Sequence, residues 1–161
     1  MKFHEFPLLI VDDELAVHKS FELIFKGKNI LFFARTGDEA LDILKRKNID
    51  LVFLDIDLPG MDGFEALKAI KEFDQSIEIV MITADKSTKS AVKSIKMGAY
   101  DYITKPFDVD EIELITERIY KEKARLLELT YLKGEVQDKF EEFNIKCHHG
   151  LKDTCQESFQ I

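Results

Sequence analysis

The chain has 161 residues, of which 45% are hydrophobic, and this suits one packed domain with an appendage. The formal net charge of −8 argues against nonspecific attraction to nucleic acid or anionic membranes, so direct DNA binding is not expected. No apolar stretch reaches the ~20 residues that a membrane span needs, and residues 1–7 lack the apolar run of a signal peptide. We therefore expect a cytoplasmic protein without membrane contacts, whose two cysteines, Cys147 and Cys155, stay reduced.

Apolar runs of strand length alternate along the chain with segments whose apolar residues recur at helical spacing. In the first half, this pattern predicts strands at residues 8–11, 30–34 and 50–55, and helices at 15–25, 36–48 and 64–73. In the second half, it predicts a strand at 78–83, a weaker helix at 85–97 with Gly98 as its C-cap, a strand at 100–104 and a long helix from Val109 onward.

Five strands that alternate with helices predict an α/β fold, with a doubly wound parallel sheet covered by helices on both faces and an extended C-terminal helix. The apolar, β-branched composition of the strands agrees with burial on both sides. In sheets of this kind, functional groups gather beyond the carboxyl ends of the strands. The residues that follow each strand are therefore the first candidates for a site.

Polar side chains stand at four of these predicted strand ends. The first strand is followed by Asp12 and Asp13, the third ends on Asp55, the fourth on Thr83, and the fifth is followed by Lys105. Unpaired carboxylates repel one another and lose hydration when they are buried, so a cation or hydrogen-bond donor is expected beside them. The sequence therefore predicts one pocket in which acidic groups and a positive charge meet.

The strand-end residues, in this order, resemble the receiver domain of two-component response regulators. The motifs are Asp12-Asp13, Asp55, Thr83 and Lys105-Pro106-Phe107, and the resemblance covers about residues 5–120. It implies a flavodoxin-like sheet with strand order 2-1-3-4-5. It also implies a phosphoacceptor signalling domain rather than an enzyme, although one able to catalyse its own phosphorylation and dephosphorylation.

The resemblance assigns a role to each residue of the phosphoacceptor site. Asp55 is expected to accept a phosphoryl group from the phosphohistidine of a sensor histidine kinase. Lys105 is expected to pair with Asp55 before phosphorylation and with a phosphate oxygen afterwards, and the hydroxyl of Thr83 to donate to another oxygen.

The same resemblance implies that Mg²⁺ is the cofactor, since this ion prefers oxygen ligands and keeps several waters. Asp13, Asp55 and the backbone carbonyl of Asp57 are expected to bind the ion directly, and Asp12 to support it through water. The side chains of Asp57 and Asp85 correspond to variable positions that, in this family, influence how fast the phosphoryl group is lost.

Thr83 and Tyr102 match the positions of the family's switch. Movement of Thr83 toward the phosphoryl group is expected to leave space into which Tyr102 turns, altering the surface made by the fourth helix, fifth strand and fifth helix. We expect this surface to pair two receivers in a homodimer when Asp55 is phosphorylated. The alternative is that Tyr102 is a half-buried strand aromatic that never moves.

Each site residue also has a purely structural interpretation. The acidic run Asp12-Asp13-Glu14 suits the cap of the first helix, Thr83 a strand end, and Lys105 a solvated surface charge. Their joint placement favours the functional interpretation. The alternative function is a phosphorylation-independent interaction scaffold with the receiver fold, whereas no separate general base supports a Mg²⁺-dependent hydrolase.

Two features of the loops are predicted from local chemistry. Pro59-Gly60 and Gly63 suit the turn after Asp55, where backbone freedom shapes the loop. The family commonly has a cis peptide at the position of Lys105–Pro106, but a trans bond is the general expectation for proline.

The chain is expected to divide into a receiver domain at residues 1–120 and a helical extension at 121–161. Eight of the ten residues at two heptad positions from 112 to 143 are apolar, which predicts a dimerising coiled coil or a signalling linker to an output region. Glu122, Lys133 and Gly134 weaken this seam, and a helix folding back on the receiver is the alternative. The spacing of Cys147, His148, His149 and Cys155 matches no zinc-finger pattern, so metal binding is not favoured there.

Overall fold

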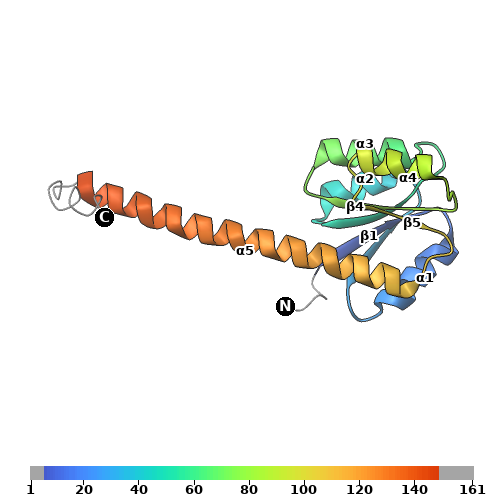
Figure 1. Cartoon of the computed structure of the whole chain (residues 1–161), viewed down its shortest axis with the longest axis horizontal. Coiled ribbons are helices and arrows are strands. Elements are labelled where there is room, and N and C mark those ends of the chain that lie inside the picture. Colours follow the sequence, from blue (N-terminus) through green and yellow to red (C-terminus); the bar gives the residue numbers. More distant parts are fainter. Residues whose placement is uncertain (1–5, 149–161) are drawn as a thin grey trace. The chain divides into compact units, whose positions relative to one another are not determined.

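The computed structural model describes residues 6–148, with side chains up to Leu132, and contains a five-stranded parallel sheet in the order β2-β1-β3-β4-β5 (Figure 1). The strands are β1 (Pro7–Val11), β2 (Ile30–Ala34), β3 (Leu51–Asp55), β4 (Glu78–Thr83) and β5 (Asp101–Thr104). The helices are α1 (Leu15–Phe25), α2 (Gly37–Arg46), α3 (Gly63–Phe73), α4 (Thr88–Lys96) and α5 (Val109–His148). The predicted α/β fold, strand order and long C-terminal helix are confirmed.

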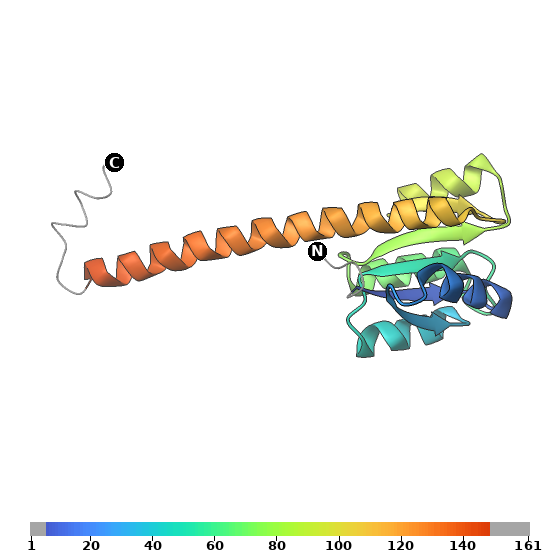
Figure 2. The ribbon, with the colours of Figure 1, turned by 90° about the horizontal axis from the view of Figure 1, so that it is seen from below.

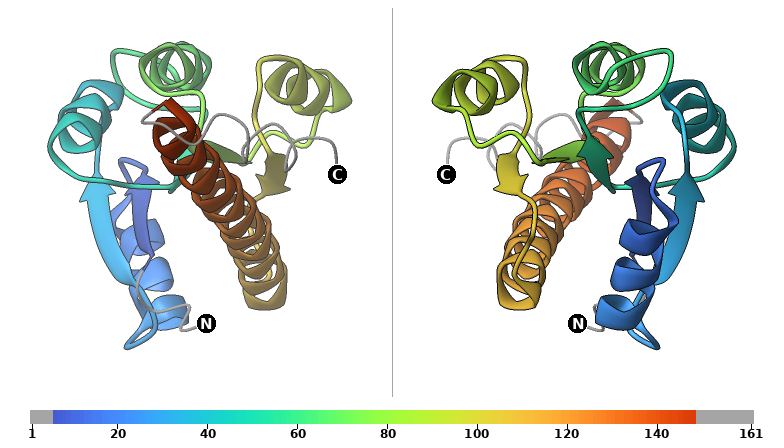
Figure 3. Two further views of the ribbon diagram at one scale, coloured as in Figure 1. Left: turned by 90° about the vertical axis from the view of Figure 1, so that its left-hand side faces the viewer. Right: turned by 90° about the vertical axis from the view of Figure 1, so that its right-hand side faces the viewer.

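Two apolar clusters hold the sheet between its helices, because successive strand residues point to opposite faces. Leu9, Val52 and Ile79 belong to the cluster on the face covered by α2, α3 and α4, as Figure 3 shows. Phe53 and Ile103 belong to the other cluster, which packs against α1 and the first turns of α5. Burial of the strands on both faces explains why they are almost continuously apolar.

The parallel register places all strand ends that carry polar groups on one edge of the sheet (Figure 2). Val11 pairs with Leu54, and Asp55 with Ile82, so the residues after β1 and at the end of β3 are neighbours. Thr83 pairs with Thr104, the residue before Lys105. The topology therefore brings four distant parts of the sequence to one edge.

The helix boundaries follow the capping residues, and α4 begins later than predicted. The sequence pattern placed this helix at 85–97, but it starts at Thr88, with Ser87 as its N-cap. The side chain of Ser87 accepts a hydrogen bond from the backbone N–H of Ser90. Ser87 thus satisfies a donor that would otherwise be free at the helix start. The predicted end is one residue late, since the helix ends at Lys96 and its C-cap is Met97 rather than Gly98. Gly98 follows the C-cap with a φ of +102°.

Phe6 and Tyr120 close the sheet's amino edge, opposite the polar strand ends. Their rings stack with centroids 4.5 Å apart, and the Tyr120 hydroxyl donates to the carbonyl oxygen of Phe6 at 3.4 Å. The side-chain amide of Asn29 donates to the same carbonyl at 3.2 Å. Burial raises the pKa of Tyr120 above its ordinary value, so the hydroxyl remains a donor at neutral pH.

Contacts within the chain group residues 1–120 into one compact unit and residues 121–161 into another. In the second unit, five large apolar side chains are at least half exposed, namely Leu126, Leu127, Leu129, Tyr131 and Leu132. The side chains of the later heptad positions and of the Cys147–Cys155 segment lie outside the described part of the chain. Within the described part of the chain, none of the helices has an apolar stretch of the length that a bilayer crossing requires.

Candidate functional site

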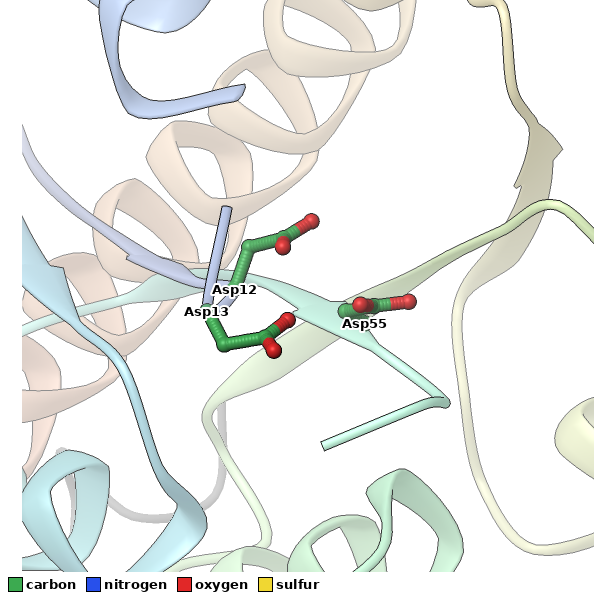
Figure 4. A group of neighbouring side chains, drawn as sticks. All are labelled: Asp12, Asp13 and Asp55. Carbon is green, nitrogen blue, oxygen red and sulfur yellow. The ribbon is translucent and has the colours of Figure 1, made fainter. Parts of the chain in front are cut away.

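Three carboxylates meet at the carboxyl edge of the sheet, where β1 and β3 lie side by side. Asp12 and Asp13 follow β1 and Asp55 ends β3, and Figure 4 shows their side chains extending from these neighbouring strand ends. One carboxylate oxygen from each residue lies within 4.8 Å of those of the other two. Asp12 and Asp55 are buried, and Asp13 is more exposed than either. The predicted acidic pocket is therefore assembled from two strands.

Lys105 supplies the positive charge that the acidic cluster requires. Its Nζ lies 2.8 Å from Asp12 Oδ2, 3.3 Å from Glu14 Oε1 and 3.6 Å from Asp55 Oδ2. Burial works against the charged amine, but the hydrogen bond to Asp12 and the nearby carboxylates outweigh it, so the pKa of Lys105 is raised. Asp12, rather than Asp55, is the nearest partner of this lysine.

Asp55 lies in an environment that disfavours its charged form. Burial, followed by the charge of Asp12, raises the pKa of Asp55 from 3.8 to about 6, although Lys105 partly opposes the shift. The backbone N–H of Asp57 donates to Asp55 Oδ1 at 3.3 Å. A cation beside this carboxylate would relieve the repulsion, so the electrostatics of the site favour a positively charged ligand.

Thr83 is the last residue of β4, and Tyr102 lies within the neighbouring strand β5. Thr83 is fully buried, and its hydroxyl oxygen accepts a hydrogen bond from the backbone N–H of Asp85 at 3.0 Å. Tyr102 is half-buried, and its hydroxyl donates to the carbonyl oxygen of Asp85. Burial and the Asp85 carboxylate raise the pKa of Tyr102. Both residues therefore contact the same loop, while their motion as a switch stays a prediction.

Asp12 has a structural role and a contact within the site. Asp12 Oδ1 accepts the backbone N–H of Glu14, the N-cap of α1, at 2.9 Å, and Asp12 Oδ2 accepts a hydrogen bond from Lys105 at 2.8 Å. The structural interpretation of Lys105, in contrast, does not fit the geometry. The Lys105 side chain is only 16% exposed, so it is not a solvated surface charge. The Lys105–Pro106 peptide bond is cis, as the family resemblance suggests and against the general expectation for proline.

Sequence reasoning missed three residues that support the site. Glu14 provides Lys105 with an additional carboxylate partner, and it was read only as part of an acidic run. Ser87 and Ser90 bind the carboxylate of Asp85, at 2.8–3.0 Å and 2.6 Å respectively. Ser87, two residues after Asp85 and just before the helical spacing begins, is a helix-start signal that would have indicated this contact.

The donor set at the acidic cluster fits a hard divalent cation. Asp12, Asp13 and Asp55 offer only carboxylate oxygens, the ligand type that Mg²⁺ prefers, and they come from a rigid sheet edge. Burial and then the charge of Asp12 raise the pKa of Asp55, and a cation would reduce the repulsion between these two carboxylates. A site built of nitrogen or sulfur ligands would favour zinc or copper instead.

Comparisons with known proteins agree with this architecture. A model of the response regulator receiver domain matches residues 8–117. Regulatory protein AtoC of Escherichia coli is 30% identical over 156 residues, which cover 96% of this chain but only 34% of AtoC. Sporulation initiation phosphotransferase F of Bacillus subtilis is 39% identical over 106 residues, covering 65% of this chain and 86% of that protein.

Solved structures lead to the same family. A CheY-like response regulator receiver domain protein from Methanospirillum hungatei superposes with a TM-score of 0.68 and 30% identity, covering 74% of this chain and 98% of that one. The residues matched by the family model include the whole polar edge, from Asp12 to Lys105. The chain therefore belongs to the response regulator receiver domain family.

Proposed function

We propose that Asp55 accepts a phosphoryl group from a sensor histidine kinase in a Mg²⁺-dependent reaction. The observation that carries this proposal is the meeting of three carboxylates within 4.8 Å with a lysine that contacts two of them. Membership of the receiver family and a matched relative named as a phosphotransferase support the same reaction class. The alternative of a scaffold that is never phosphorylated gives no reason for this arrangement of charges.

In the proposed reaction, a carboxylate oxygen of Asp55 attacks the phosphorus of the phosphohistidine. The new P–O bond forms as the P–N bond breaks, giving an acyl phosphate on Asp55 and returning the kinase histidine. The side chain begins this step as a nucleophile, and its charged form predominates above the pKa of about 6. Lys105 neutralises charge near Asp55, and the hydroxyl of Thr83 donates to a phosphoryl oxygen.

Asp13, Asp55 and the backbone carbonyl of Asp57 are the residues that we propose to hold Mg²⁺, with Asp12 supporting it through water. When bound, the ion would offset the negative charge of the carboxylates and of the incoming phosphoryl oxygens. Asp57 is exposed and its backbone N–H already contacts Asp55, so its carbonyl lies in the same short loop.

Incubation with acetyl phosphate and Mg²⁺ is expected to add one phosphoryl group to the chain, detected by intact-protein mass spectrometry. Asp55→Asn should abolish the gain because it removes the nucleophile, and omission of Mg²⁺ should reduce it at least about tenfold. Asp42→Asn is the control, since it makes the same change at an exposed carboxylate of α2. An unmodified wild-type mass would favour the scaffold function.

We also propose that residues 1–120 form the receiver and that residues 121–161 link it to a partner or output region. The alignment with AtoC continues through the extension, and this chain spans about a third of that protein. The extension presents five exposed, large apolar side chains between Leu126 and Leu132, a pattern that favours pairing with a second helix. A homodimer joined through this segment and through the switch surface is the proposed assembly, and its location is the cytoplasm.

Sedimentation velocity is expected to show a concentration-dependent dimer that the double substitution Leu126→Asp and Leu129→Asp weakens at least about tenfold. These leucines occupy the predicted heptad seam and are 63% and 50% exposed. Glu128→Gln, between them, is the matched control and should leave the dimer intact. Equal masses for the wild type and the double variant, with or without a phosphoryl mimic, would contradict pairing through this helix.

A further inference from the structure

Asp85 contacts three separate parts of the molecule around the loop between β4 and α4. Its backbone N–H donates to the Thr83 hydroxyl at 3.0 Å, and its backbone carbonyl accepts the hydroxyl of Tyr102. Its carboxylate accepts hydrogen bonds from Ser87 and Ser90 at the start of α4. One residue thus joins the end of β4, the aromatic of β5 and the first turn of α4.

Both carboxylate oxygens of Asp85 accept hydrogen bonds from residues at the start of α4. Oδ1 accepts from the Ser87 backbone N–H at 2.8 Å, and Oδ2 accepts from the hydroxyls of Ser87 at 3.0 Å and Ser90 at 2.6 Å. The hydroxyl of Ser90 and then the groups of Ser87 lower the pKa of Asp85, so the carboxylate is charged at neutral pH. A negative charge at a helix N-terminus is also favoured by the helix dipole.

We propose that Asp85 is a positioning residue that transmits a shift of Thr83 to α4, and that its carboxylate does not act on the phosphoryl group directly. This proposal rests on the proposed phosphorylation of Asp55. A threonine hydroxyl carries one donor hydrogen and two acceptor lone pairs. Thr83 can therefore donate to a phosphoryl oxygen while it still accepts the N–H of Asp85, and the loop follows its movement.

The surface that would respond belongs to α4. The Asp85 carboxylate holds Ser87, the N-cap, and Ser90, one turn into the helix, and Ser90 in turn accepts the hydroxyl of Ser94 through its backbone carbonyl at 2.8 Å. We call the hydrogen bonds that join Asp85, Ser87, Ser90 and Ser94 the clamp. Because Ser94 is completely buried, the clamp extends from the loop to the packed side of the helix. Val92 and Ile95, 44% and 50% exposed, lie on the helix that this clamp holds.

Hydrogen exchange of the unphosphorylated full chain tests the clamp itself. Asp85→Ala and Ser90→Ala are expected to speed exchange of the α4 backbone amides about five- to tenfold, because each removes a bond at the helix start. Lys89→Ala, an exposed residue in the same turn, is the matched control. Exchange at wild-type rates in both Asp85→Ala and Ser90→Ala would overturn the proposal. This outcome does not depend on whether Asp55 can be phosphorylated.

Exchange with beryllofluoride and Mg²⁺, a phosphoryl mimic, tests the transmission. In the wild type, the mimic should change the protection of backbone amides from exchange at residues 101–104 and in α4. In Ser90→Ala, the change at residues 101–104 should remain, and the change in α4 should fall by at least half. An undiminished α4 response in Ser90→Ala would overturn the role of the clamp. The first experiment can show an intact clamp while the mimic changes no amide protection in the wild type. The proposed phosphorylation of Asp55 would then be contradicted, and with it the transmission to α4.

The lifetime of the acyl phosphate separates positioning from direct action. If Asp85 positions α4, then Asp85→Asn and Ser90→Ala should shift the rate of phosphoryl loss in the same direction, and the double variant should shift it no further. If Asp85 acted on the phosphoryl group, Asp85→Asn alone would change the rate. The proposal would therefore be overturned if Ser90→Ala lost the phosphoryl group at the wild-type rate while Asp85→Asn lost it at a different rate.

Discussion

Asp55→Asn is expected to make the metal-free protein more stable, raising the free energy of unfolding by about 1–3 kcal/mol at about pH 7.5. The folded protein holds the pKa of Asp55 at about 6, above the value of 3.8 expected in the unfolded chain. The folded state therefore binds the proton more tightly, and stability falls as the pH rises from about 4 to about 6. The full difference corresponds to at most about 3 kcal/mol, and asparagine removes it because it carries no charge.

Urea unfolding at about pH 7.5 and about pH 4, without divalent ions, measures this effect. The increase in the free energy of unfolding that Asp55→Asn causes should be largest at the higher pH and should approach zero at the lower pH. Mg²⁺ should stabilise the wild type and have a smaller effect on the variant. Asp57→Asn, which changes an exposed carboxylate of the same loop, should stay close to wild type. A destabilised Asp55→Asn protein at about pH 7.5 without metal would contradict the role of burial and repulsion.

Gly63→Ala is expected to destabilise the protein by at least about 3 kcal/mol and to abolish phosphoryl uptake. A Cβ at this position would lie 2.3 Å from the carbonyl oxygen of Asp55 and 2.4 Å from Cα of Ile56. Both neighbours are backbone atoms at the end of β3, so the strand or the start of α3 must shift to relieve the clash. The hydrogen bond from Gly63 N–H to the Ile56 carbonyl, 2.8 Å long, fixes the two segments together.

Gly60→Ala provides the matched comparison for Gly63→Ala in the same loop. Gly60 has a φ of +76° and no atom within 4 Å of an added Cβ, so its substitution costs backbone strain without a clash. This strain should amount to about 1 kcal/mol. Thermal and urea unfolding followed by circular dichroism measure both variants. Equal free energies of unfolding for the two variants would show that the close approach of Gly63 to the backbone of Asp55 and Ile56 does not affect stability.

The arrangement of strands and helices could be predicted because each element carries its own local signal. The run Leu8–Val11 and the segment Leu51–Leu54 are buried on both sheet faces, and their continuous apolar character indicates this directly. Gly98 marks the end of α4, since its positive φ suits glycine alone. The order of the strands in the sheet, in contrast, came from the family resemblance, because periodicity does not state which strands are neighbours.

The start of α4 could not be placed from apolar spacing, because side-chain hydrogen bonds determine it. Asp85 and Ser87 form an extended, exposed turn before the helix, in which polar side chains replace the backbone bonds of a further helical turn. Apolar periodicity carries no information about such bonds. The prediction therefore began the helix three residues too early.

Asp12, Asp13, Asp55 and Lys105 lie close together, as their places at the strand ends indicate, but their individual contacts could not be predicted. Lys105 lies closest to Asp12, because the Asp12 carboxylate is buried between β1 and the lysine, and the sequence contains no signal of this geometry. Gly63 was predicted as a flexible turn residue, whereas its backbone has no positive φ and its small size is what the close approach requires. Distances of this kind depend on packing between elements that are remote in the sequence.

The stacked rings of Phe6 and Tyr120 bring the residue before the first strand and the last residue of the receiver unit together. Both residues lie at the amino edge of the parallel sheet, whereas Asp12, Asp55 and Lys105 lie at its carboxyl edge. A segment that follows Tyr120 is therefore attached at the edge of the sheet opposite these polar groups.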